Sequence, residues 1–198
     1  MSTDIRLTRL TGLQISPYLA DLARLRISVF REFPYLYVGT PAYEERYLAT
    51  YSRSPASLFV LAWDQGRIVG AATGVPLRDE TAEIQQPFVT HGYALEQVFY
   101  FGESVLLPEY RGQGIGVRFF AEREAYAQEL GGMRYTAFCA VQRPPDHPRR
   151  PPQYVPLDAF WERRGYSRHP ELHTLMTWQD LDDASVSPTR MVFWLREW

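Results

Sequence analysis

The sequence predicts a single α/β domain with a mixed β-sheet, and three observations support this fold class. The length of 198 residues fits one domain. Apolar runs that alternate as in strands occur between segments whose apolar residues recur at helical spacing. At the centre, a strand-like run, a glycine-rich turn and a helical segment follow one another without a linker. We therefore treat residues 1–198 as one domain.

The N-terminal part predicts one strand and two helices. Residues 5–10 largely alternate apolar and polar side chains, which is typical of a strand. Ser16, an N-cap residue followed by a proline, starts a helix that we expect to end near Pro34. The same signal at Thr40 starts a second, shorter helix.

The next part predicts a hairpin, a long loop and a central strand. The apolar runs 57–63 and 67–75 are joined by a short turn that contains Gly66, which favours two antiparallel strands. Periodicity then fails over residues 76–94, where prolines and a glycine predict a loop. Residues 98–107 are again strongly strand-like.

The C-terminal half predicts two helices, three strands and a second loop. Residues 143–156 hold six of the 15 prolines, so this segment can form neither a regular helix nor a central strand. The remaining expected elements are a helix after Gly116 that ends at the glycines 131–132, a strand over 134–141, a helix over 158–164, and strands over 171–178 and 191–198.

Composition and charge exclude several classes of function. All 21 basic residues are arginines, so the chain has no lysine for a Walker A phosphate loop or for Schiff-base chemistry. A net charge of −2 argues against nucleic acid as a partner. No apolar run is long enough to span a bilayer, and the N-terminus lacks the apolar region of a secretion signal. We therefore expect a cytoplasmic protein without a membrane partner.

A metal site is not expected either. Cys139 is the single cysteine, which excludes a disulfide framework and a multi-cysteine zinc site. The four histidines lack the spacing of zinc ligands, and Pro170 prevents a helix that would align His169 with His173. Apolar neighbours make Cys139 an unreactive core residue rather than a thiolate.

The most specific motif is the segment VLLPEYRGQGIG, which begins at Val105 and lies between the central strand and the following helix. Glycines 112, 114 and 116 leave backbone N–H groups unobstructed at a helix N-terminus, where an anion is favoured. Arg111 adds a charged donor. This turn is expected to bind a phosphate or pyrophosphate. A dinucleotide fingerprint fits poorly, because the last glycine comes one position early.

The pattern R-x-x-G-x-G, together with the preceding LLPEY, resembles the acyl-CoA motif of the GNAT superfamily of N-acetyltransferases. The resemblance implies a GNAT-like single domain with a mixed, mostly antiparallel sheet of about seven strands and about four helices. It also implies acetyl-CoA as the acyl donor. Backbone amides of the turn would bind the CoA pyrophosphate, and the preceding strand would pair with the pantetheine arm. The cofactor-binding residues implied are Val105, Leu106, Arg111, Gly112, Gln113, Gly114, Ile115 and Gly116.

A second segment, FWERRGY from Phe160, resembles a late signature of the same family. Many members have a tyrosine that serves as general acid toward the CoA thiolate where this chain has Trp161, and an indole N–H does not usefully ionise. Tyr154, Tyr166 or solvent could replace that acid, and Tyr154 is our candidate. Trp161 is expected to pack beside the cofactor arm.

Glu103 is the candidate general base for an acceptor amine. Strand alternation places it on one face with apolar residues, and apolar surroundings disfavour the charged form of a carboxylate. The resemblance also implies a base on this strand. The alternative is a structural glutamate paired with an arginine. Tyr35 and Tyr37, between the first two helices, are the candidate acceptor-binding residues.

The sequence therefore predicts acetyl transfer from acetyl-CoA to a primary amine, by direct attack in a ternary complex. Polyamines, aminoglycosides, amino acids and peptide N-termini all remain compatible as acceptors, and a homodimer is left open. The loops 76–94 and 143–156 are expected to flank the acceptor groove. Two other classes are a CoA-binding sensor without turnover and an interaction module that uses the proline-rich segment 143–156.

Overall fold

The computed structural model describes residues 5–198, and residues 1–4, part of the N-terminal segment judged to lack a secretion signal, lie outside it. The predicted first strand is β1 (Arg6–Thr11). The helix expected from Ser16 begins as a 3-10 segment, η1 (Gly12–Tyr18), because Pro17 lies inside that turn, and continues as α1 (Leu19–Phe30). The second helix, α2 (Pro41–Ser52), is confirmed.

The sheet is mixed and almost entirely antiparallel, as predicted, with eight strands rather than about seven. Its order is β1-β2-β3-β4-β6-β8-β7, and β5 pairs with β3 off this path. Within residues 5–198, only β4 and β6 pair in parallel. The strands after β1 are β2 (Leu58–Asp64), β3 (Arg67–Pro76), β4 (Val98–Tyr100), β5 (Ser104–Leu106), β6 (Tyr135–Val141), β7 (Ser167–Trp178) and β8 (Ser187–Glu197).

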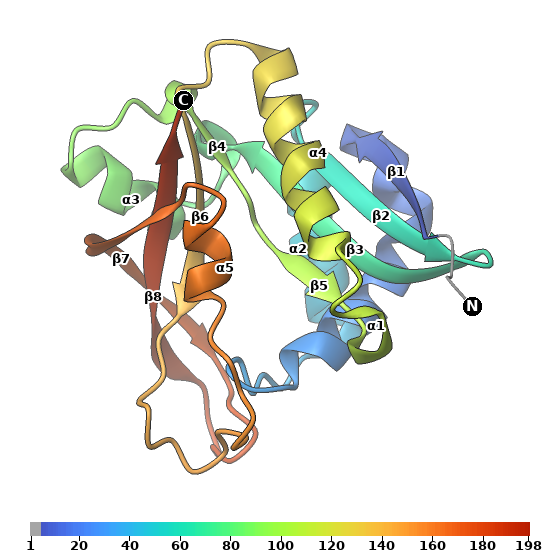
Figure 1. The fold of residues 1–198 in the computed structure, drawn as a ribbon, viewed down its shortest axis with the longest axis vertical. Helices are drawn as coiled ribbons and strands as arrows, with labels where there is room; N and C mark the ends of the chain where they lie inside the picture. Colours follow the sequence, from blue (N-terminus) through green and yellow to red (C-terminus); the bar gives the residue numbers. More distant parts are fainter. Residues whose placement is uncertain (1–4) are drawn as a thin grey trace.

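The strand expected over 98–107 is split into β4 and β5, and this split opens the sheet. β4 runs beside β6 as far as Phe101, whose N–H donates to the Ala137 carbonyl at 2.7 Å. β5 instead follows β3, with Leu106 opposite Gly70. β5 and β6 therefore diverge, with α4 (Ile115–Leu130) beside β5 and α5 (Asp158–Glu162) beside β6 (Figure 1).

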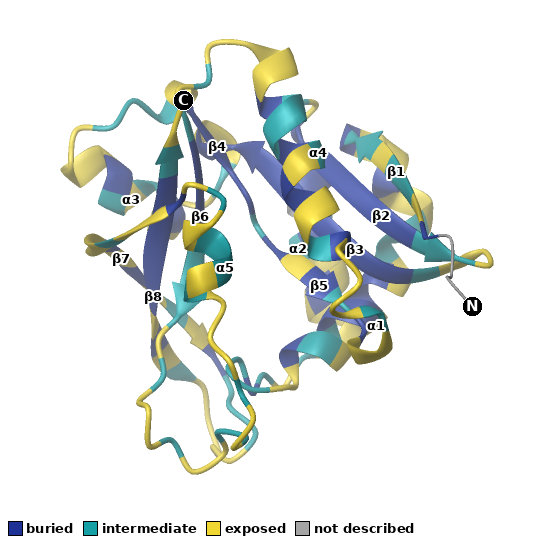
Figure 2. Cartoon of the chain, viewed as in Figure 1, coloured by how far each residue is buried: buried dark blue, intermediate teal, exposed yellow. Residues whose placement is uncertain are grey.

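Helices cover both faces of the sheet. α4 packs on β2 and β3 in front of the sheet, and α1 packs on β3 and β5 from behind, with α2 beside it (Figure 1). Figure 2 shows that β2 and β3 are buried between these layers, and that most of β8, in the other half of the sheet, is buried as well. No helix within residues 5–198 combines the length and the apolar character that a bilayer span requires.

The expectation of a loop over residues 76–94 is wrong, because this segment contains α3 (Ala82–Thr90) between the 3-10 turns η2 (Leu77–Asp79) and η3 (Leu95–Gln97). Pro87 lies inside α3 and leaves the Glu83 carbonyl without its usual helical donor. The Thr174 hydroxyl of β7 donates to that carbonyl at 2.8 Å. A partner distant in sequence thus satisfies the backbone group that the proline leaves open.

The proline-rich segment 143–156 is irregular, as predicted, and Arg143 anchors it. The Arg143 guanidinium donates to the carbonyls of Pro34 (2.9 Å) and Tyr35 (2.8 Å), and to both carboxylate oxygens of Asp180 (2.6 and 2.8 Å). One half-buried arginine therefore ties this segment to the α1–α2 connection and to the chain after β7.

Candidate active site

A cavity of about 1290 Å³ lies where β5 and β6 diverge. Residues 101–104 and Leu106 line one side, and residues 138–141 line the other. The glycine-rich turn and α5 border it, as do the end of α1 and the proline-rich segment. The cavity thus joins the expected phosphate-binding turn to the centre of the sheet.

The glycine-rich turn has the backbone that an anion site needs. Gly112 and Gly114 have φ of 76° and 78°, a conformation that side chains with a Cβ rarely adopt. Gly114 is the N-cap of α4, whose first amides have no acceptor inside the helix. Gly116 does not have a positive φ, and a Cβ there would lie 3.6 Å from the Phe160 ring, which is an ordinary contact. The exposed start of α4 can therefore offer donors to a phosphate.

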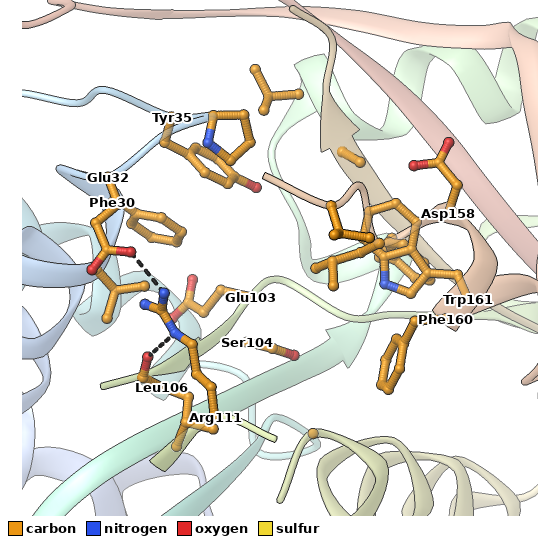
Figure 3. Close-up of a pocket in the computed structure, with 18 of the residues that line it drawn as sticks. Phe30, Glu32, Tyr35, Glu103, Ser104, Leu106, Arg111, Asp158, Phe160 and Trp161 are labelled. Carbon is orange, nitrogen blue, oxygen red and sulfur yellow. Dashed lines mark hydrogen bonds and ion pairs between the residues drawn. The ribbon is translucent and has the colours of Figure 1, made fainter. Parts of the chain in front are cut away.

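Arg111 lies at the mouth of the cavity but already has two partners. Its Nε donates to the Leu106 carbonyl at 3.1 Å, and Nη1 donates to the Glu32 carboxylate at 2.7 Å (Figure 3). Val105 is fully buried in the core, whereas Leu106 lines the cavity. Of these two strand residues, only Leu106 brings its side chain to the cavity.

Glu103 lies at the centre of the cavity wall, but the expectation of apolar surroundings is wrong. Its carboxylate forms a buried ion pair with Arg26 of α1, whose Nε donates to Glu44 of α2. The Arg26 guanidinium lies 4.5 Å from the centroid of the Tyr47 ring. Burial opposes its charge, but Glu103, Tyr47 and Glu44 raise the pKa of Arg26 above its usual value.

Arg123 is a site residue that the sequence analysis missed. It is 1% exposed and fills the point where β4 and β5 separate. Nη1 donates to the carbonyls of Glu103 (3.1 Å) and Thr73 (3.3 Å), and Nη2 donates to the Ser104 hydroxyl (2.8 Å). Burial lowers the pKa of Arg123 to about 10. Its place on the apolar face of α4, four residues after Phe119, was the available signal.

The two candidate acceptor-binding residues, Tyr35 and Tyr37, lie in different places, and only Tyr35 lines the cavity. Tyr35 lines the cavity, with its ring 4.5 Å from that of Phe30 (Figure 3). Tyr37 is not among the residues that line the cavity, and burial together with the nearby Glu44 carboxylate raises the pKa of Tyr37. Tyr154 lines the cavity from the proline-rich segment, edge to face with Phe33 at 4.7 Å. Burial raises the pKa of Tyr154.

Trp161 also lines the cavity and packs with its ring 5.0 Å from each of the rings of Phe138 and Trp194. The hydroxyl of Tyr166, the other candidate acid, donates to the Glu124 carboxylate at 3.0 Å and lies at hydrogen-bond distance, 2.8 Å, from the Thr136 hydroxyl. These bonds keep the Tyr166 hydroxyl engaged on the α4 side of β6.

Cys139 lines the cavity from β6, and its Sγ lies 3.1 Å from the Tyr100 hydroxyl. Burial raises the pKa of the Cys139 thiol to about 12, which disfavours the thiolate a nucleophile requires. Over residues 5–198, no group of three or more histidine, cysteine and acidic side chains is arranged to hold a metal ion.

A sheet opened between two strands, with a helix N-terminus at the mouth of the opening, is a site that can hold a phosphate-bearing ligand. The model of the Acetyltransferase (GNAT) family matches residues 22–166, and the chain belongs to this family of acetyltransferases. A comparison with curated protein sequences finds no match.

Solved structures confirm the fold. A ribosomal-protein-alanine N-acetyltransferase from Brucella melitensis is 13% identical with a TM-score of 0.61, and the alignment covers 98% of this chain and 99% of that one. A GNAT acetyltransferase from Streptococcus pneumoniae is 12% identical with a TM-score of 0.59, covering 98% and 100%. An acetyltransferase from Thermus thermophilus is 18% identical with a TM-score of 0.57, covering 98% and 97%.

Proposed function

We propose that this acetyltransferase moves the acetyl group of acetyl-CoA to a primary amine by direct attack in a ternary complex. One observation carries the proposal: a single cavity joins the amides of the glycine-rich turn to the Glu103 carboxylate and the aromatic wall at Tyr35. Donor and acceptor can therefore enter one continuous space and meet at the divergence of β5 and β6.

The donor would bind along β5. Amides of the turn from Gly112 to Gly116 would hold the pyrophosphate, and the pantetheine arm would follow Leu106 and Ser104 into the opening. Trp161 would pack against that arm, in keeping with its position on the wall opposite β5 (Figure 3). The positive end of the α4 dipole adds to the attraction for phosphate.

The proton transfers would involve two residues of the cavity wall. Glu103 would accept a proton from the ammonium form of the acceptor, which produces the neutral amine that attacks the thioester. Arg26 would hold that carboxylate in place. Tyr154 would donate a proton to the departing thiolate, and Tyr35 would contact the acceptor. No covalent enzyme intermediate is needed.

The test is acetyl-CoA calorimetry followed by an acceptor panel with a free-thiol readout. The panel would contain spermidine, kanamycin, 2-phenylethylamine, single amino acids and a short peptide with a free N-terminus. Thiol release that depends on one class of amine supports the proposal. Binding of acetyl-CoA without turnover would favour a sensor, and the absence of binding would favour an interaction module built on residues 143–156.

A further inference from the structure

A row of three side chains runs from the cavity wall toward the surface and has no role in the reaction described so far. The Tyr47 hydroxyl donates to the Tyr51 hydroxyl at 3.3 Å, and Tyr51 donates to Oε1 of Glu80. Both tyrosines are one turn apart on α2, and Glu80 lies between η2 and α3. Two elements distant in sequence thus meet in one hydrogen-bonded row.

The chemistry of the row gives it a direction. An ionised carboxylate only accepts hydrogen bonds, so the single proton of Tyr51 must point to Glu80. The Tyr51 oxygen then accepts the hydrogen bond that the Tyr47 hydroxyl donates. The lone pairs of the Tyr47 oxygen remain able to accept a proton. A proton that enters at Tyr47 can therefore move to Glu80 by one shift at each hydroxyl.

The inner end of the row lies beside Glu103. The Arg26 guanidinium that pairs with the Glu103 carboxylate lies 4.5 Å from the centroid of the Tyr47 ring, so both side chains contact the same cation. Burial, and after it the charge of Glu103, raise the pKa of Tyr47. The cavity wall is also close to Tyr51, since a Cβ added to Gly102 would clash with the Tyr51 hydroxyl. Gly102 lines the cavity and precedes Glu103. The absence of a side chain there leaves room for the hydroxyl.

The outer end of the row is a carboxylate with neutral partners. Glu80 accepts hydrogen bonds from the Tyr51 hydroxyl and from the Thr81 amide at 2.9 Å, and its side chain keeps some exposure to solvent. Burial raises the pKa of Glu80, which makes it a better proton acceptor. The ionisable groups around it are Tyr47 and Tyr51 of α2, Glu83 of α3, Tyr100 of β4, Cys139 of β6 and Glu103.

We propose that Tyr47, Tyr51 and Glu80 form a proton relay that carries the acceptor's proton from Glu103 to solvent. This inference rests on the proposed function. The ion pair with Arg26 needs the Glu103 carboxylate in its ionised form, so a proton taken up there has to leave before the pair forms again. The relay therefore restores the carboxylate that meets the next ammonium group.

Every proton and electron pair in the proposed transfer is accounted for. An ammonium N–H bond breaks, and its proton passes from Glu103 to the Tyr47 oxygen as the Tyr47 proton moves to Tyr51 and the Tyr51 proton moves to Glu80. The nitrogen lone pair attacks the thioester carbon, and the C–S bond breaks with its electrons on sulfur. The nitrogen loses a second proton as the adduct collapses, sulfur gains one, and Glu80 releases the relayed proton to water.

The test compares Glu80→Gln and Tyr51→Phe with the parent, using the most active amine of the panel at saturating acetyl-CoA. Each variant is expected to lower kcat by roughly 10- to 100-fold, within the range of general acid–base catalysis, while the acetyl-CoA Kd stays unchanged. Because Glu80 must be ionised to accept a proton, parental kcat rises with pH through its titration. That rise should disappear in Glu80→Gln.

Glu45→Gln and Tyr43→Phe, both exposed positions of α2, are the matched controls and should keep the parental kcat and pH profile. Tyr51→Phe keeps the buried ring and loses only the hydroxyl, so it tests the relay even if Glu80→Gln fails to fold. A folded Tyr51→Phe with parental kcat and an unchanged pH profile would overturn the relay alone. A parent that acetylates no amine of the panel would overturn the proposed function and the relay with it.

Discussion

Arg26 and Glu103, 77 positions apart, form a buried ion pair that joins α1 to the point where the sheet opens. Glu44 pairs with the same guanidinium, so one cation serves two carboxylates that are almost completely buried. The pair therefore links the stability of the N-terminal helices to the position of the group proposed to receive the acceptor's proton.

Arg26→Met should destabilise the fold strongly. The substitution removes the shared cation and leaves two buried carboxylates without a counter-charge, which costs about 3–5 kcal/mol of unfolding free energy. Urea denaturation followed by circular dichroism measures the change. Arg24→Met, on the exposed side of the same helix, is the control and should change stability little. A loss below about 1 kcal/mol for Arg26→Met would contradict the buried pair.

Gly116→Asp should weaken acetyl-CoA binding by at least ~2 kcal/mol, because it places a negative charge beside the proposed pyrophosphate. Position 116 is the best choice in the turn, since it has no positive φ and a Cβ there makes only an ordinary contact. Gly116→Asn has the same shape without the charge and isolates the electrostatic part. Calorimetry gives both values. Parental affinity in a folded Gly116→Asp protein would show that the phosphate binds elsewhere.

Glu32→Gln should strengthen acetyl-CoA binding modestly. Glu32 pairs with Arg111 at 2.7 Å at the mouth of the cavity, where the carboxylate competes with a phosphate for the guanidinium. Both side chains are substantially exposed, so a gain of ~0.2–1 kcal/mol is expected, and added salt should reduce it. Binding titrations at low and high salt measure this effect. Weaker binding by Glu32→Gln would mean that Glu32 positions Arg111 for the cofactor instead of competing with it.

Local signals predicted most of the elements and the glycine-rich turn. Gly112 and Gly114 could be recognised because their conformation is a property of the turn itself, and both adopt the positive φ expected of such glycines. Residues 76–94 were interpreted incorrectly because Pro87 is a local breaker, whereas the bond from Thr174 to Glu83 that compensates for it is non-local.

The polar partners of the site could be predicted only in part, for the same reason. The alternative of Glu103 paired with an arginine is the arrangement that the structure shows, but the sequence did not indicate which arginine. Alternation placed Glu103 on a buried face, but its pairing with Arg26 depends on how α1 packs behind the sheet. Arg123 lies on an apolar face of α4, which looks like a helix face that only packs in the core. It donates to the carbonyls of Thr73 and Glu103 at the place where β4 and β5 separate. Such contacts follow from the fold, which the chemistry of single residues does not specify.

Glu103→Gln should lower kcat by on the order of 10²–10⁴, because the amide keeps the size of the side chain but cannot accept the acceptor's proton. The fold should survive, since Arg26 retains Glu44 as a partner. The acetyl-CoA Kd should be unchanged. The rise of kcat with pH that Glu80 produces should be lost as well, because no proton then enters the relay.

Steady-state kinetics with the best amine of the panel measure these effects, with Glu129→Gln on the exposed end of α4 as the control. Near-parental kcat with an unchanged pH profile would remove Glu103 from the mechanism. A second carboxylate, Glu96, is exposed in η3, next to the end of β4 that is distant from β5, and is therefore poorly placed to act as a base through water. That outcome would therefore favour an amine that binds already neutral, and acceptors of lower basicity should then react fastest at acidic pH.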